Sequence, residues 1–160
     1  MSTAAVIDWR SLDLADGGRS LIEASAGTGK TWTIAVLYLR LLLERQLSPR
    51  QIVVTTFTDA AAQELRERLR GKLQWAVLRA IENLAGSNDT GSDEGSDGQW
   101  LRARWQHDAE LRVRDLQRLR LALAEMDVAP VSTLHSLCRR ILADHPFACG
   151  VAFVMGDMVP

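Results

Sequence analysis

The sequence predicts an α/β fold with parallel strands, and three observations point to it. Short apolar segments rich in β-branched residues alternate with longer segments whose apolar residues recur every three or four positions. A glycine-rich loop stands between the first apolar segment and the first helical one. The length of 160 residues suits one ordinary domain with a buried core. Strands that alternate with helices in this way are typical of a parallel sheet.

The first expected elements are two strands with a helix between them. Residues 20–24 (SLIEA) are short, apolar and bounded by turn residues, so they predict a buried strand. Residues 30–46 carry apolar side chains at helical spacing, and Ser48-Pro49 ends that helix. Residues 52–56 (IVVTT) are β-branched and predict a second buried strand.

A long helical segment follows the second strand. Thr58 or Asp59 can cap a helix that runs through residues 60–86, because either side chain accepts a hydrogen bond from a first-turn amide. Residues 86–99 are acidic and almost free of apolar groups, so we expect a mobile loop there. Residues 100–126 predict an Arg-rich helical stretch that is broken once.

The C-terminal part returns to the α/β pattern. Residues 130–133 (PVST) predict a short strand, and residues 135–144 predict a helix that Pro146 stops. Residues 151–155 predict the start of one more strand.

The overall composition excludes several classes of protein. The 19 basic and 20 acidic residues give a net charge of −1, so no global basic excess points to nucleic acid. Cys138 and Cys149 are too few for a disulfide framework. No signal peptide is evident, and the apolar run 34–43 is too short to span a membrane. These features predict a soluble, cytoplasmic protein.

The segment AlaSerAlaGlyThrGlyLysThr at 24–31 is the strongest chemical signal, and it predicts a phosphate-binding P-loop. Gly27 and Gly29 let backbone amides approach a phosphate closely. Lys30 places a positive charge on the β- and γ-phosphates, and the Thr31 hydroxyl can ligate Mg²⁺. Ala24 stands where the usual pattern has glycine, and the motif by itself does not decide between ATP and GTP. The expected nucleotide-binding residues are Ala24, Ser25, Ala26, Gly27, Thr28, Gly29, Lys30 and Thr31, with Lys30 and Thr31 catalytic.

The remaining parts of a phosphoryl-transfer site are not evident. Such a site also needs a carboxylate for Mg²⁺ and usually an arginine at the γ-phosphate. Glu23 is most simply a polar residue at a strand end, and Asp157 stands alone. The sequence therefore predicts a nucleotide cradle without a complete catalytic apparatus.

Three segments in the same order resemble the helicase motifs of the RecB family, whose members are UvrD-like superfamily-one DNA helicases fused to a nuclease. They are LIEASAGTGKTWTIAVLYLRLLLE (21–44), VVTTFTDAAAQELRERL (53–69) and VSTLHSLCRRIL (131–142). The EASAGTGKT form is closer to this family than to UvrD or AddA. The resemblance implies a RecA-like motor domain and an ATP-driven, Mg²⁺-dependent 3′-to-5′ motor on single-stranded DNA that acts in double-strand-break repair and recombination.

The resemblance also implies where DNA binds. Thr56, Phe57 and Thr58 match the first DNA-contacting segment, and Thr133, His135 and Ser136 match a later one. Both lie where a strand meets a helix, so hydroxyls and free amides can bind phosphate there. The structural alternative is that the hydroxyls cap helices, Phe57 is a core residue and the histidine is satisfied within the fold.

Further implications concern partners and parts of the protein outside this chain. RecB-family subunits assemble with RecC-like and RecD-like subunits. The acidic Mg²⁺ motif, the second motor domain, the γ-phosphate arginine and the nuclease are expected beyond Pro160, which would make this chain an N-terminal fragment. The expected divisions are residues 1–59 (P-loop core of the first motor domain), 60–128 (inserted helical subdomain) and 129–160 (return to the motor domain).

The helical insertion carries local basic charge. Residues 66–79 contain five basic residues and one acidic one, and residues 102–120 contain six basic and three acidic ones. They predict either a surface that follows duplex DNA or a solvated face with internal ion pairs. The tryptophans Trp75, Trp100 and Trp105 are expected in the core or at a partner, and Cys138 is expected as a small core residue.

Two other functions stay open at this point. The chain can be a different P-loop enzyme, such as a small kinase, although no substrate lid or second acidic site is visible. It can also be a non-catalytic fragment that only docks on partner subunits through its helical insertion.

Overall fold

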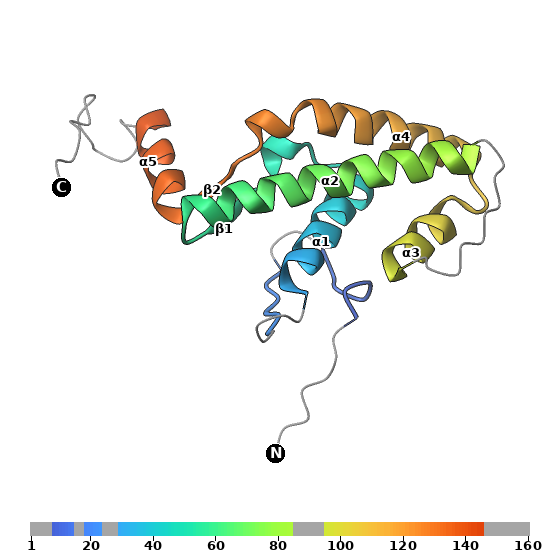
Figure 1. Cartoon of the computed structure of the whole chain (residues 1–160), viewed down its shortest axis with the longest axis horizontal. Coiled ribbons are helices and arrows are strands. Elements are labelled where there is room, and N and C mark those ends of the chain that lie inside the picture. The colour runs from blue at the N-terminus through green and yellow to red at the C-terminus, as the bar shows by residue number, and fades with distance from the viewer. Residues whose placement is uncertain (1–7, 15–17, 24–28, 85–94, 146–160) are drawn as a thin grey trace, which may run out of the picture.

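The computed structural model describes residues 8–14, 18–23, 29–84 and 95–145. A long helix crosses the middle of the molecule, and the other elements lie along it (Figure 1). In chain order the elements are α1 (Lys30–Glu44), the 3₁₀ turn η1 (Pro49–Gln51), β1 (Val54–Thr56), α2 (Asp59–Leu84), α3 (Ser96–Trp105), α4 (Ala109–Ala124), the 3₁₀ turn η2 (Met126–Val128), β2 (Val131–Thr133) and α5 (Leu134–Asp144).

A two-stranded parallel sheet joins segments that are far apart in the sequence. Val54 in β1 lies opposite Val131 in β2, and Thr56 lies opposite Thr133. Both strands are shorter than the predicted segments, but the prediction of parallel strands that alternate with helices is confirmed. The protein is therefore a helix-rich α/β structure with a small parallel sheet. The larger sheet of a RecA-like domain stays a prediction.

The predicted strand at 20–24 is wrong for the residues that the structure describes. Residues 20–23 form no strand, and the side chain of Leu21 is 77% exposed. A strand is stabilised by hydrogen bonds to a neighbouring strand, whatever its own residue pattern. Within the described part of the chain, β1 and β2 pair only with each other. Ala24 and the further strand predicted at 151–155 lie outside the described residues.

The hydrophobic core lies between helices α1, α2 and α4. Each contributes apolar residues at helical spacing. In α2 and α4 one face is buried and the opposite face meets solvent, whereas residues 35–44 of α1 are buried or half-buried throughout. Trp105 is buried in the core, while Trp75 and Trp100 are half-buried and pack against it, in agreement with the expectation that the three lie in the core or at a partner. The fully buried leucines are Leu39, Leu42, Leu69, Leu73 and Leu119, among others.

The helix ends agree with the sequence in two places. Thr58 caps α2, because its Oγ1 accepts a hydrogen bond from the Ala61 amide at 3.2 Å. The predicted break in the Arg-rich stretch lies at residues 106–108, between α3 and α4. Asp108 caps α4 by accepting from the Leu111 amide at 2.7 Å.

The predicted loop at 86–99 is wrong at its C-terminal end, because residues 96–99 form the first turn of α3. Asp97 is buried there and forms an ion pair with Lys72 of α2. A carboxylate in the first turn also favours the helix N-terminus. Residues 86–94 lie outside the described part of the chain.

Several basic residues of α2 form intramolecular ion pairs or hydrogen bonds. Arg68 and Arg79 pair with glutamates along α2, while Arg70 pairs with Asp127. Arg66 donates to the Val131 carbonyl of β2 at 2.6 Å. These contacts favour the interpretation of a helix face with internal ion pairs over a duplex-binding surface on this helix.

Candidate nucleotide and nucleic-acid sites

The described part of the predicted P-loop lies at the N-terminus of α1. Gly29 is the N-cap residue and has a left-handed backbone, with φ of 85°. Its carbonyl accepts hydrogen bonds from the Thr33 amide at 2.9 Å and from the Thr33 hydroxyl at 3.2 Å. Lys30 and Thr31 are the first two residues of the helix, and no side chain from the described residues caps it. First-turn amides without a side-chain acceptor suit an anion.

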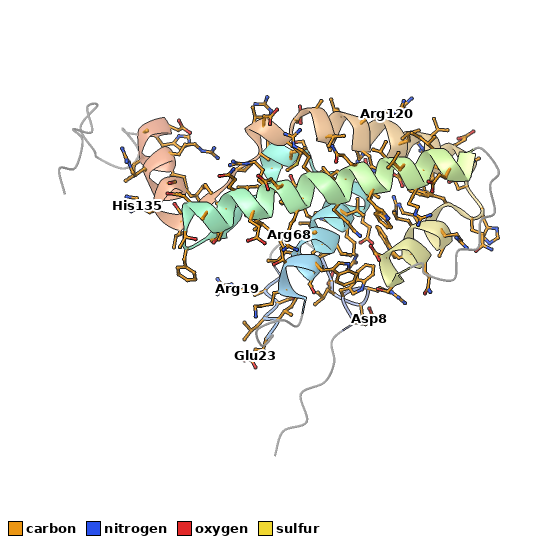
Figure 2. All side chains as sticks on the ribbon, viewed as in Figure 1. Asp8, Arg19, Glu23, Arg68, Arg120 and His135 are labelled. Carbon is orange, nitrogen blue, oxygen red and sulfur yellow. The ribbon has the colours of Figure 1, made fainter. Side chains whose placement is uncertain are left out.

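The other predicted nucleotide-binding residues, Ala24, Ser25, Ala26, Gly27 and Thr28, lie outside the described residues. Lys30 is exposed and Thr31 is half-buried. Glu23 is exposed at the end of the segment 18–23 (Figure 2). The roles of Lys30 and Thr31 therefore remain predictions that their position at the start of α1 supports.

Alanine is expected to have opposite effects on stability at two glycines. At Gly29 a Cβ meets nothing within 4 Å, but the positive φ strains any L side chain, so Gly29→Ala should lower the free energy of unfolding by about 1–2 kcal/mol. Gly71, inside α2, also has free space. Gly71→Ala should raise the free energy of unfolding by about 0.5–1 kcal/mol. Urea denaturation measures both, and equal effects would contradict the left-handed assignment.

A cavity of about 260 Å³ lies between α1 and α2 beside Thr31. Trp32 and Trp75 line it together with Lys72, whose Nζ lies 3.7 Å from the Trp75 ring centroid. Burial lowers the pKa of the Lys72 ammonium to about 8. The ion pair between Lys72 and Asp97 joins α2 to α3 beside this cavity.

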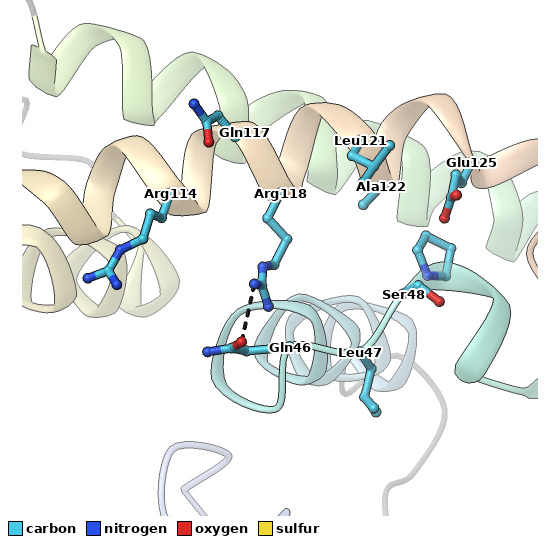
Figure 3. A pocket seen from close by; sticks show the side chains of 10 residues that line it. Gln46, Leu47, Ser48, Arg114, Gln117, Arg118, Leu121, Ala122 and Glu125 are labelled. Carbon is cyan, nitrogen blue, oxygen red and sulfur yellow. Dashed lines mark hydrogen bonds between the residues drawn. The ribbon is translucent and has the colours of Figure 1, made fainter.

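A second cavity, of about 370 Å³, lies between α4 and the turn that follows α1 (Figure 3). Arg118 reaches across it and donates to Gln46 at 3.3 Å. This cavity adjoins the C-terminal end of α1, and a helix of 15 residues places Lys30 about 22 Å away. Its position excludes this cavity as the nucleotide site predicted around Lys30.

The two predicted DNA-contacting segments meet at one edge of the sheet. Thr56 and Thr133 are register partners at the ends of β1 and β2, so Phe57 and Leu134 follow neighbouring strands. The side chain of Phe57 is 97% exposed, which makes the core alternative wrong for this residue. Leu134 is 55% exposed. The sheet thus brings two exposed apolar side chains to the same edge, and the sequence pattern drew attention to only one of them.

The hydroxyls of these segments have different surroundings. Thr133 is buried and caps α5, since its Oγ1 accepts from the Ser136 amide at 3.2 Å and donates to the Ser136 hydroxyl at 2.9 Å. Thr58 likewise caps α2 and is exposed, while Thr56 is half-buried. His135 and Ser136 are exposed at the start of α5, and Figure 2 labels His135 there. Capping occupies Thr133, so the accessible groups of its segment are His135 and Ser136.

The expectation that Cys138 is a core residue is wrong, because its side chain is exposed. Helix α5 has no buried residue and projects from the end of the molecule beyond β2 (Figure 1). Its apolar stripe, which includes Cys138 and Ile141, has too little described chain packed against it to become core.

Comparisons with known proteins show the family to which the chain belongs. The UvrD/REP helicase N-terminal domain family matches residues 8–155. The RecBCD enzyme subunit RecB of Haemophilus influenzae is 38% identical over 142 residues, which cover 84% of this chain and 11% of the relative. The RecB subunit of Escherichia coli is 38% identical over 144 residues, covering 85% of this chain and 11% of that protein.

A more distant relative gives the same result. The RecB subunit of Mycobacterium tuberculosis H37Rv is 35% identical over 127 residues, or 79% of this chain and 11% of the relative. The chain therefore spans about a tenth of the length of the curated relatives it matches. None of the helices in the described part of the chain is long and apolar enough to cross a membrane. The chain belongs to the UvrD/REP helicase N-terminal domain family and is a RecB-like member of it.

Proposed function

We propose that this chain is the ATP-binding and DNA-contacting part of a RecB-like helicase motor. The GlyLysThr sequence at the start of α1, with Gly29 in a left-handed conformation, carries this proposal. Residues 24–31 would hold the phosphates of ATP, Lys30 would neutralise the β- and γ-oxygens, and Thr31 would ligate Mg²⁺. The ion that Thr31 would hold would supply positive charge against the negative charge that develops on the phosphates.

Single-stranded DNA is the proposed nucleic-acid substrate. Thr56, Phe57 and Thr58 would contact it from one strand end, and His135 and Ser136 from the other. The exposed ring of Phe57 supports this because a base can stack on an accessible aromatic face, whereas the bases of a duplex are stacked on each other. Thr133 would act by fixing the α5 N-terminus rather than by touching DNA.

The relatives are named as RecB subunits of the RecBCD enzyme, so the proposed setting is a complex with RecC-like and RecD-like subunits. The role of this complex would be ATP-driven DNA unwinding with exonuclease activity in double-strand-break repair and recombination. Because this chain covers about a tenth of those relatives, the nuclease and the second motor domain would lie in other parts of the protein. Duplex contacts on the helical insertion are a weaker part of the proposal, given its internal ion pairs.

Nucleotide titration calorimetry on the 160-residue chain tests the nucleotide part. With Mg²⁺ present, we expect saturable ATP binding that chelation of the metal weakens, since the proposed Thr31 ligand acts through the ion. Circular dichroism first establishes that the chain has formed its helices. A folded chain that takes up no ATP at millimolar concentration would instead favour the fragment that only docks on partner subunits.

A further inference from the structure

The two helices that begin at the sheet edge differ in charge. Helix α2 starts with Asp59, whose carboxylate occupies the positive end of the helix and repels an incoming phosphate. Helix α5 has no acidic residue in its first turn. Because β1 and β2 are neighbours, the N-termini of α2 and α5 lie side by side. A phosphate of bound single-stranded DNA can therefore lie near either of them. Phosphates are favoured on the α5 side of that edge.

The polar face of α5 also favours phosphates further along the helix. Arg139 lies one turn beyond His135, and Arg140 lies one turn beyond Ser136, so each pair shares a side of the helix. All four residues are exposed. Within the described part of the chain no hydrogen bond or ion pair engages either arginine, whereas the basic residues of α2 are paired. The nearest carboxylate on the same helix is Asp144, at its far end.

We infer that the polar face of α5 carries the sugar–phosphate backbone of the bound single strand, with Arg139 and Arg140 as phosphate contacts, while Phe57 and Leu134 face its bases. This inference rests on the proposed DNA binding and adds to it the path of the strand. One helical turn advances about 5.4 Å, which lets groups on successive turns meet successive phosphates. Arginine suits this role because its planar guanidinium donates two hydrogen bonds to one phosphate.

The exposed side chains of Phe57 and Leu134 indicate which side of the bound single-stranded DNA faces the protein there. Phe57 and Leu134 are 97% and 55% exposed and follow register partners, so both lie at the sheet edge where α5 begins, and we call this pair the apolar step. Unpaired bases gain from contact with such a step, while phosphates lose hydration there. A strand that places its backbone over α5 and its bases over the step satisfies both.

The test uses two fluorescent oligomers of equal length, oligothymidylate and an abasic oligomer that has the backbone alone. Anisotropy titrations compare the unaltered chain with three variants. They are Arg139→Gln/Arg140→Gln, the matched control Arg114→Gln/Arg120→Gln, and Phe57→Ala. The control removes the same charge from exposed positions on α4, and Figure 2 places Arg120 away from His135.

We expect the α5 double variant to bind both oligomers about tenfold more weakly or worse at 0.1 M salt, and its log–log salt slope to fall by about 1.4, because each phosphate contact contributes about 0.7 on single strands. The control should bind as the unaltered chain does. Phe57→Ala should weaken binding of oligothymidylate alone and leave the salt slope unchanged, because stacking releases no counterions.

Three outcomes would overturn the inference. Equal losses in the two double variants would indicate a general charge effect. If the α5 double variant binds DNA as tightly as the unaltered chain while Phe57→Ala binds it more weakly, the DNA backbone does not lie on α5. The proposed DNA binding itself would then still hold. Failure of the folded, unaltered chain to bind either oligomer would overturn the proposed DNA contacts too, whereas nucleotide titration judges ATP binding separately.

Discussion

A full-length protein that carries Lys30→Ala is expected to lose its DNA-stimulated ATP hydrolysis. The Lys30 ammonium stands at the start of α1, where it would stabilise negative charge on the β- and γ-phosphates. Removal of one such electrostatic contact typically lowers the turnover rate by roughly 10²–10³-fold. The rate of phosphate release, measured with and without single-stranded DNA, checks the prediction.

Two further variants make this result specific to the charge and its place. Arg120→Ala removes an exposed cation on α4 and should leave hydrolysis unchanged. Lys30→Arg keeps the positive charge but replaces a compact ammonium with a larger, planar guanidinium. This variant should therefore retain little ATP hydrolysis. DNA affinity of Lys30→Ala, measured without nucleotide, should stay close to that of the unaltered protein. Retained hydrolysis in Lys30→Ala would refute the assignment of the phosphate site.

The largest expected loss of stability follows Asp115→Ala. Asp115 is buried in α4 and accepts hydrogen bonds from Arg104 Nε at 2.7 Å and from the Trp105 indole at 2.9 Å. Arg104 also donates to the Leu43 carbonyl at the end of α1, so this group joins three helices. Without the carboxylate, a largely buried guanidinium loses its counter-charge, which typically costs about 3–5 kcal/mol.

Asp127→Ala is the matched control for that change, because it removes a carboxylate that also pairs with an arginine. The Asp127 side chain is 80% exposed, and its contact with Arg70 is 2.5 Å long. Exposed ion pairs contribute about 0–1 kcal/mol, so this variant should unfold at nearly the same urea concentration as the unaltered chain. Similar losses in the two variants would contradict the view that burial makes the Asp115 network important.

Much of the fold could be predicted from local residue patterns. The spacing of apolar residues indicated α1, α2 and α5, and β-branched residues indicated the strands at 54–56 and 131–133. The hydroxyl of Thr58 indicated a helix start that the structure confirms. In each case the informative residue pattern lies within one helical turn or along one strand. The same locality explains why the GlyLysThr motif could be found without knowledge of the fold.

Other features depended on contacts between distant segments. Residues 20–23 have the pattern of a strand but find no strand partner in the described chain, so Leu21 remains exposed. Residues 96–99 look like part of an acidic loop but form a helix in which Asp97 reaches Lys72, more than twenty positions earlier. Their state follows from a buried ion pair, which no local pattern contains.

The sequence by itself indicated the predicted phosphate-binding motif, the main helices and the segments that form β1 and β2, because these patterns lie among residues that are neighbours along the chain. Only the tertiary structure decided that Phe57 and Leu134 share an edge, that Cys138 is exposed and that Arg139 and Arg140 have no partner in the described chain. The physical reason is that strand register and burial depend on which distant segments pack together.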